Sequence, residues 1–242
     1  MASTGLRTRT RFGVLTLNYK GLPYRVKYLK IEEVEPTMKA MGIPPTSTTK
    51  FPYYTLPMIA DPSANPNEKP TYVSDSFQIA AYLDEKYPSP AYPAVLPTET
   101  RTFQRIFAEA YFLSAFGAMF PAIAPRVPGI LDEASQEYMY RSRGGKDKFA
   151  PLSATDEAHQ FSLAREKWGE LAQMVDLGGG GPWIMGEKPT FADFVVGCAF
   201  SLWHKVDSDG AIWKEVATWQ DGRWDKYWNR IQAIENKSTA VA

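Results

Sequence analysis

The sequence has almost no cysteine and almost no histidine. Among its 242 residues there is one cysteine, Cys198, and there are two histidines, His159 and His204. A disulfide framework and a zinc site built on spaced cysteines and histidines are therefore excluded. Cys198 lies in the apolar stretch FVVGCAFSL, which indicates a small buried hydrophobic residue rather than a reactive thiol. Neither histidine lies in a context that predicts a nucleophilic triad.

An excess of charge of either sign is also missing. Lys plus Arg and Asp plus Glu number 27 each, so no global field favours nucleic acid or an anionic membrane. The start of the sequence lacks the apolar region of a secretory signal, and the longest uncharged run, residues 110–125, is too short to span a bilayer. We therefore expect a cytoplasmic protein that binds neither nucleic acid nor membrane. The Ser-, Thr- and Arg-rich first residues leave a mitochondrial presequence as a minor alternative.

The first ninety or so residues have the pattern of a small α/β unit. Apolar residues at helical spacing predict a helix in RFGVLTLNYKG that ends at Gly21. Alternation predicts a strand in YRVKYLKI, and YYTLPMIAD and TYVSD predict two more strands that flank a hairpin loop. A helix then runs to about Lys86.

The rest of the sequence has a helical pattern. Four prolines in residues 87–100 indicate a linker, and the segments that follow repeat apolar residues at spacings of three and four. We therefore assign residues 1–87 to the α/β domain, 88–98 to the linker and 99–242 to an all-helical domain.

Two motifs in the helical part favour structure over chemistry. The run GGGG at residues 178–181 follows a helix and lacks the Lys and Ser or Thr of a phosphate-binding loop, so it predicts an inter-helix turn. In PTFAD, Thr190 and Asp193 have the spacing of a capping box, in which each side chain satisfies backbone N–H groups at the start of a helix. We interpret this box as folding chemistry.

Two motifs in the α/β part suggest a ligand site. Pro57, in TLPMI, interrupts a predicted strand and therefore marks an edge, a bulge or a cis peptide bond. If Leu56 beside it were exposed, its N–H and C=O could pair with an extended peptide ligand. Asp75 can cap the following helix, and the hydroxyl and N–H of Ser76 in its first turn can face an anion. Helix capping needs only one of these two side chains, so the other is available for a ligand.

Together these motifs carry a family resemblance. The segments LNYKGLPY, GIPPTSTTK, YYTLPMIAD, VSDSFQIAAYLDEKYP and GEKPTFADF resemble those of fungal glutathione S-transferases of the β-etherase-like and ustiloxin-cluster types. The resemblance runs from about residue 11 to the last helices. It implies a thioredoxin-like N-terminal domain, then an all-helical domain. It also implies an enzyme of detoxification or secondary metabolism, usually homodimeric, whose activated glutathione thiol attacks a hydrophobic electrophile or cleaves an ether.

The resemblance also implies roles for particular residues. Pro57 would be the cis-proline, and Leu56 would pair its backbone with the cysteinyl part of glutathione. Asp75 and Ser76 would hold the γ-glutamyl end, and Lys50 could reach the same ligand. No metal is implied. Candidates for the apolar acceptor pocket in the helical domain are Tyr111, Phe112, Phe116 and Met119.

The start of the sequence departs from the family pattern. Family members begin with a strand and a serine-bearing loop, whereas this sequence reaches its first helix within about ten residues, which implies that the first strand is absent. The catalytic serine, which hydrogen-bonds the thiolate, would fall at Ser3 or Thr4. The alternative to an active transferase is therefore a catalytically impaired glutathione-fold binding protein or a truncated gene product.

Overall fold

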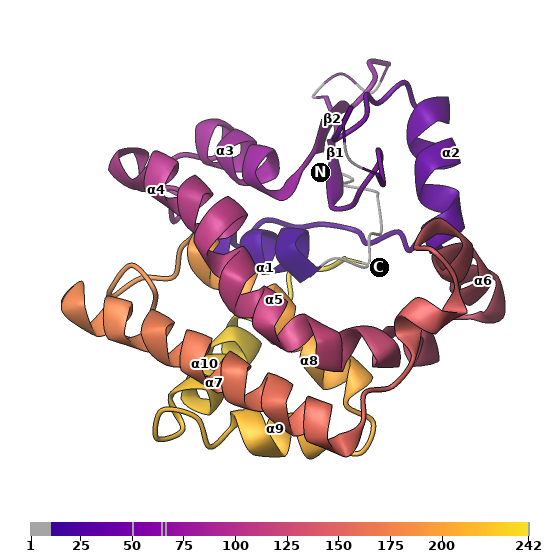
Figure 1. Cartoon of the computed structure of the whole chain (residues 1–242). Helices are drawn as coiled ribbons and strands as arrows, with labels where there is room; N and C mark the ends of the chain where they lie inside the picture. Colours follow the sequence, from indigo (N-terminus) through magenta and orange to yellow (C-terminus); the bar gives the residue numbers. More distant parts are fainter. Residues whose placement is uncertain (1–10, 50, 64, 66, 242) are drawn as a thin grey trace. The chain divides into compact units, whose positions relative to one another are not determined.

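The computed structural model of the chain describes residues 11–49, 51–63, 65 and 67–241 (Figure 1). The chain forms two compact units. One comprises the described residues up to Thr98 together with those from Gln232 onward, and the other comprises Glu99–Ile231. We call them the N-terminal unit and the helical unit. The first contains a small sheet with helices, and the second is built from helices, as the sequence predicts.

The N-terminal unit is built around a β-hairpin. Its elements are α1 (Arg11–Lys20), η1 (Ile31–Glu33), α2 (Val34–Ala40), β1 (Met58–Asp61), β2 (Thr71–Ser74) and α3 (Ser76–Lys86). The predicted hairpin is present: β1 and β2 are antiparallel, with Met58 opposite Ser74 and Asp61 opposite Thr71. Helix α2 occupies a stretch for which the sequence predicted no element.

The predicted strand in YRVKYLKI is wrong. In the described part of the chain this stretch contributes no strand, and Tyr24 forms an isolated parallel bridge with Ala240. The alternating pattern predicted the burial of this stretch only in part: Tyr24 is buried and Val26 is half-buried, but Tyr28 is 63% exposed. Alternation of apolar and polar residues indicates that one face of a segment is buried. A strand also needs a neighbouring strand to pair with, and local sequence does not specify that partner.

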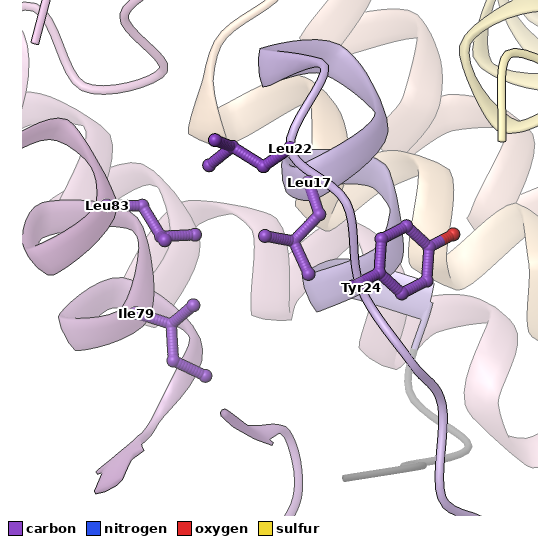
Figure 2. Close-up of a cluster of buried hydrophobic side chains, with 5 residues drawn as sticks. All are labelled: Leu17, Leu22, Tyr24, Ile79 and Leu83. Carbon is purple, nitrogen blue, oxygen red and sulfur yellow. The ribbon is translucent and has the colours of Figure 1, made fainter. Parts of the chain in front are cut away.

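A compact apolar cluster joins α1 and α3 in the N-terminal unit (Figure 2). Leu17 comes from α1, Leu22 and Tyr24 come from the segment that follows it, and Ile79 and Leu83 come from α3. All five side chains are buried, and burial of this kind supplies about 1.5–3 kcal/mol for each large apolar side chain. The cluster fixes α1 against α3.

A buried ion pair ties the same two helices to the chain that follows α3. The Nζ atom of Lys20 lies 2.9 Å from Oδ1 of Asp84, and both side chains are buried. Lys20 also donates to the carbonyl oxygens of Tyr87 and Pro93, each at 2.9 Å. Asp84 accepts from two backbone N–H groups that lie after Pro93. Each charge is therefore compensated and hydrogen-bonded, which a buried ion pair requires.

The helical unit contains helices in the segments with apolar spacings of three and four, as the sequence predicts, and several helices that the sequence did not predict. Its elements are η2 (Thr98–Thr100), α4 (Arg101–Ile106), the π-helix η3 (Phe107–Tyr111), α5 (Phe112–Ile123), η4 (Ala124–Ile130), α6 (Glu133–Ser142), η5 (Lys146–Phe149), α7 (Ala154–Leu177), α8 (Phe191–Val206), α9 (Ala211–Val216) and α10 (Arg223–Glu235). α10 ends within the N-terminal unit. The sequence patterns did not predict the short helices α6 and α9.

Aromatic rings form the centre of the helical unit. The ring of Trp168, on α7, lies 4.9 Å from that of Phe200, 5.2 Å from that of Trp203 and 4.8 Å from that of Trp224, measured between centroids. The indole N–H of Trp168 donates to the carbonyl of Ala115 at 3.2 Å, so its polar atom is satisfied although the residue is fully buried. These contacts bring α5, α7, α8 and α10 together.

Glycine brings α10 close to α8. A Cβ atom added at Gly197 would lie 2.9 Å from Cγ2 of Ile231, closer than atoms of this kind approach. Gly197 lies in the interior of α8, where glycine costs about 1 kcal/mol relative to alanine. The glycine is therefore explained by packing.

The capping box predicted from PTFAD is present at the start of α8. The carboxylate of Asp193 accepts from the N–H and the hydroxyl of Thr190, at 2.7 and 2.9 Å. It also accepts from the N–H of Ile184 at 2.7 Å and from the hydroxyl of Tyr227 at 2.5 Å. Burial raises the pKa of Asp193, although these hydrogen bonds act in the opposite direction. The box thus extends beyond its own helix to α10.

Candidate functional site

The peptide bond between Leu56 and Pro57 is cis. This is the geometry that the resemblance implied for Pro57, which is buried, whereas Leu56 is half-buried. Leu56 packs against a small cluster formed by Met38, Ile43 and Met58. Its main-chain N–H and C=O form no hydrogen bond with another described residue. Side-chain packing thus fixes the position of Leu56 while its peptide groups remain available for a ligand.

Asp75 caps α3, as the sequence predicted. One of its carboxylate oxygens accepts from the backbone N–H groups of Phe77 at 3.0 Å and Gln78 at 3.1 Å. Its φ is +77° and its ψ is 131°, a conformation that residues other than glycine rarely adopt. Such a conformation costs on the order of 1–3 kcal/mol and is concentrated at functional sites. Strain at Asp75 therefore supports a role beyond capping.

Ser76 is the first residue of α3. Among the described residues its hydroxyl has no hydrogen-bond partner. The N-terminus of an α-helix carries a partial positive charge and unpaired N–H groups, so an anion placed there is stabilised. Ser76 therefore has the hydroxyl and the helix position that the anion-site hypothesis needs.

Strand pairing brings the two motifs together. Pro57 immediately precedes β1 and Asp75 immediately follows β2, and the antiparallel register places Met58 opposite Ser74. The Leu56–Pro57 pair and the Asp75–Ser76 pair therefore lie beyond the same end of the hairpin. One face of the site offers peptide groups, and the other offers a carboxylate, a hydroxyl and a helix N-terminus. This combination can bind an extended anionic peptide.

The remaining predicted residues are placed less favourably or are not described. Ser3, Thr4 and Lys50 lie outside the described residues. Of the four acceptor-pocket candidates in the helical unit, two belong to the buried core and two are half-buried. The buried pair is Phe112 and Met119, and the half-buried pair is Tyr111 and Phe116. The described residues include no group of three or more His, Cys, Asp or Glu side chains that could hold a metal ion.

Sequence patterns did not reveal a carboxylate with two tyrosines beside the hairpin. The Oδ2 atom of Asp61, at the end of β1, accepts from the hydroxyl of Tyr82 at 2.8 Å, and the hydroxyl of Tyr87 lies 3.4 Å away. Burial raises the pKa of Tyr82 to about 12, and the hydrogen bond to Asp61 adds to the shift. Burial and the charge of Asp61 also raise the pKa of Tyr87. Both phenols thus stay protonated and hold the carboxylate.

Asp61 and Tyr87 also line a cavity of about 190 Å³ in the N-terminal unit. Its walls are otherwise mainly apolar and come from α1, from residues 22–26, from β1 and from α3. No sequence signal could have found this cavity, because its walls come from separate segments of the chain.

Two family models match the chain. The model described as "Glutathione S-transferase, N-terminal domain" matches residues 13–86, and the one described as "Glutathione S-transferase, C-terminal domain" matches residues 102–233. Together they cover most of the chain, which therefore belongs to the glutathione S-transferase family. Its two halves are the thioredoxin-like N-terminal domain and the helical C-terminal domain of that family.

Several similar proteins come from fungi. The glutathione S-transferase-like protein ustS of Aspergillus flavus is 27% identical over 241 residues, which cover 92% of this chain and 83% of ustS. A glutathione S-transferase of Ceriporiopsis subvermispora, solved in complex with glutathione, is 30% identical, with a TM-score of 0.82 over 93% of this chain and 90% of its own. A second transferase from that fungus, also solved with glutathione, is 31% identical, with a TM-score of 0.79 over 95% of this chain and 92% of its own.

Proposed function

We propose that this chain binds glutathione beyond the end of the β1–β2 hairpin and transfers it to a hydrophobic electrophile. The observation that carries the proposal is the convergence of the Leu56–Pro57 and Asp75–Ser76 pairs at that end. Glutathione-bound structures of relatives about 30% identical support the choice of ligand.

The chemistry of glutathione matches the groups at this site. Glutathione is an extended anionic tripeptide, so its cysteinyl unit can exchange strand-like hydrogen bonds with the main chain of Leu56. The N–H and hydroxyl of Ser76 can hold the γ-glutamyl carboxylate, where the helix dipole of α3 favours negative charge. The carboxylate of Asp75, one oxygen of which already caps α3, can attract the α-ammonium group.

The transfer step requires a thiolate. A hydrogen-bond donor beside the sulfur lowers the pKa of the thiol, after which the sulfur forms a bond to the electrophilic carbon and the leaving group departs. Ser3 or Thr4 is the predicted donor. An activated aromatic ring and an ether carbon are the two candidate electrophiles. The half-buried aromatics Tyr111 and Phe116 are candidates for contact with the acceptor.

The test separates binding from catalysis. Retention on immobilised glutathione measures binding, and turnover of a generic thiol acceptor and of an aryl ether measures transfer. Ser76→Ala should weaken glutathione binding by about 1–3 kcal/mol, the contribution of a lost charge-assisted hydrogen bond, and should change stability much less. Ser153→Ala, which removes a helix cap in the helical unit, should change stability without changing glutathione affinity.

Three outcomes would change the proposal. If Ser76→Ala lowers stability and affinity equally, Ser76 is only part of a helix terminus. If the chain is retained on glutathione but turns over neither acceptor, it is a glutathione-binding protein without transferase activity. If Ser3→Ala and Thr4→Ala each leave turnover unchanged, the thiolate takes its hydrogen bond from another group.

We also propose that the protein is a homodimer. Along the helical run that begins with α4 and continues through α5, one stripe of apolar residues is exposed at spacings of three and four. The stripe consists of Phe103, Ile106, Ala110, Leu113, Gly117 and Phe120. Its four large side chains have relative exposures between 47% and 70%. Repeats of this spacing pack against a second helix of the same kind, and contiguous exposed apolar surface of this kind marks an interaction site.

The same stripe allows a different partner. The helix Thr98–Ile130 is long and apolar enough to cross a membrane by length and composition alone, and only 28% of its most apolar stretch is buried. Leu113→Lys should convert a dimer to a monomer in light scattering, whereas the neighbouring exposed Ser114→Lys should not. A monomeric wild-type chain that sediments with neutral lipid vesicles would replace the dimer with a membrane-bound form.

We propose a cytoplasmic location. The basic first residues leave mitochondrial import as the alternative. Fractionation followed by N-terminal sequencing separates the two, since import would give mitochondrial protein with a new N-terminus near residue 10.

A further inference from the structure

The C-terminal segment Ser238–Val241, which we call the tail segment, lies beside Tyr24 and pairs with it through a single parallel bridge. The N–H of Tyr24 donates to the carbonyl of Thr239 at 3.4 Å, and the N–H of Val241 donates to the carbonyl of Tyr24 at 2.8 Å. These two bonds form the parallel bridge between Tyr24 and Ala240. The tail segment therefore occupies one backbone edge of the Tyr24 segment.

One buried asparagine sets the register of this pairing. The Oδ1 atom of Asn18, on α1, accepts from the hydroxyl of Tyr24 at 2.9 Å and from the N–H of Thr239 at 3.2 Å. Its Nδ2 donates to the carbonyl of Glu235 at 3.0 Å. The hydroxyl of Thr239 donates to the carbonyl of Leu22 at 2.6 Å. A hydroxyl residue is thus recognised at one position of the tail segment.

Hydrogen bonds, with little apolar burial, hold the tail segment in place. Ser238 and Ala240 are exposed, and Val241 is 44% exposed. Segments with few buried apolar contacts open locally at a small fraction of the free energy of global unfolding. When the tail segment opens, the N–H and C=O of Tyr24 lose partners, and Asn18 loses one as well. An edge of this kind is a template for strand addition.

We propose that the tail segment is a releasable strand that closes a peptide-binding edge at Tyr24. The partner that fits the open edge is an extended peptide with threonine or serine at the register of Thr239 and small residues beside it. The carbonyl of Leu22 selects the hydroxyl residue, Asn18 accepts from the backbone N–H of that residue, and Tyr24 supplies the backbone pairing. This site is separate from the proposed glutathione site and does not depend on it.

Peptide binding tests the proposal directly. The probe is a labelled peptide with the sequence NKSTAVA, residues 236–242, and its fluorescence anisotropy is measured with the full chain and with a chain that ends at Glu235. The shortened chain should bind at least about tenfold more tightly than the full chain, because its edge has no competing strand. Replacing the threonine of the probe with alanine should weaken binding about tenfold, the loss of roughly one buried hydrogen bond.

Amide hydrogen exchange keeps the proposal testable if the shortened chain does not fold. In the full chain, Thr239→Ala should accelerate exchange at the amides of Tyr24 and Val241 together, by about tenfold. Lys237→Ala, a change of an exposed neighbour, is the matched control and should leave both unchanged. A folded shortened chain that does not bind the probe, or a Tyr24 amide that stays protected while Val241 exchanges, would overturn the proposal.

Discussion

Different kinds of interaction stabilise the interior of each of the two units. In the helical unit, the buried rings around Trp168 contact one another, and their neighbours belong to four helices. In the N-terminal unit, a five-residue apolar cluster is supplemented by buried polar groups, with Lys20–Asp84 and Asn18 each linking segments distant in sequence. The N-terminal unit is thus more dependent on specific hydrogen bonds.

The proposed glutathione site lies in the N-terminal unit, the one that depends more on polar contacts. A small sheet with a short hairpin buries limited apolar area, so its loops must be fixed by side chains that also have polar partners. The proposed glutathione site lies at the end of that hairpin and includes the strained Asp75. The helical unit depends mainly on aromatic packing, and an exception within it tests the comparison most strongly.

That exception is Asp193, a buried carboxylate in the aromatic unit. Asp193→Ala would leave the N–H groups of Ile184 and Thr190 and the hydroxyl of Tyr227 without an acceptor. We expect the free energy of unfolding to fall by about 5 kcal/mol, because each buried unsatisfied group costs about 1–3 kcal/mol. Urea denaturation followed by tryptophan fluorescence measures the change. The control is Asp147→Ala, a change of an exposed residue, which should leave the free energy of unfolding nearly unchanged. A small loss of stability for Asp193→Ala would mean that water replaces the carboxylate.

The ion pair of the N-terminal unit comes next. Lys20→Met should lower the free energy of unfolding by about 3 kcal/mol, because it leaves the charge of Asp84 buried without its partner. The double variant Lys20→Met with Asp84→Asn should recover part of that loss, because the amide removes the uncompensated charge while its oxygen can still accept from the backbone N–H groups after Pro93. A double-mutant cycle by chemical denaturation measures the coupling. If the two single changes add without coupling, the pair does not act as a unit.

The smallest effect concerns pH. Because the pKa of Tyr82 rises from about 10 to about 12 on folding, the folded chain keeps a proton that the unfolded chain loses in this range. The contribution of Tyr82 to the free energy of unfolding is therefore complete below pH 10 and is lost as pH rises towards 12. Tyr82→Phe should cost about 1 kcal/mol at neutral pH, for its bond to Asp61, and should flatten the alkaline slope.

Denaturation at several alkaline pH values measures this slope. Part of it should remain in Tyr82→Phe, because burial also raises the pKa values of Tyr87 and Tyr227. An unchanged slope would assign the alkaline sensitivity to those residues.

Local patterns predicted the parts of this structure that depend on nearby residues. The cap at Asp75 and the box at Thr190 and Asp193 each join residues a few positions apart, and both are present. The hairpin and the longer helices follow from apolar periodicity for the same reason. The position of the proposed site was predictable in part, because a proline before one strand and a cap after the next converge whenever the two strands pair.

Long-range partners were not predictable from the sequence. Nothing near Asp84 indicates Lys20, and nothing near Tyr24 indicates that its strand-like pattern would pair with Ala240. Asp61 lies 21 residues from Tyr82 in sequence and meets it only in the folded chain. The predicted catalytic donors Ser3 and Thr4, and Lys50, lie outside the described residues and stay predictions.

The close approach of Gly197 to Ile231 constrains how this family member can diverge. Any side chain at position 197 needs room that Ile231 occupies, so position 231 must become smaller whenever position 197 becomes larger. We therefore expect these two positions to covary among homologous sequences, with glycine opposite large aliphatic residues and alanine opposite smaller ones. Such linked changes would let α8 and α10 keep their spacing while the surfaces around them diversify.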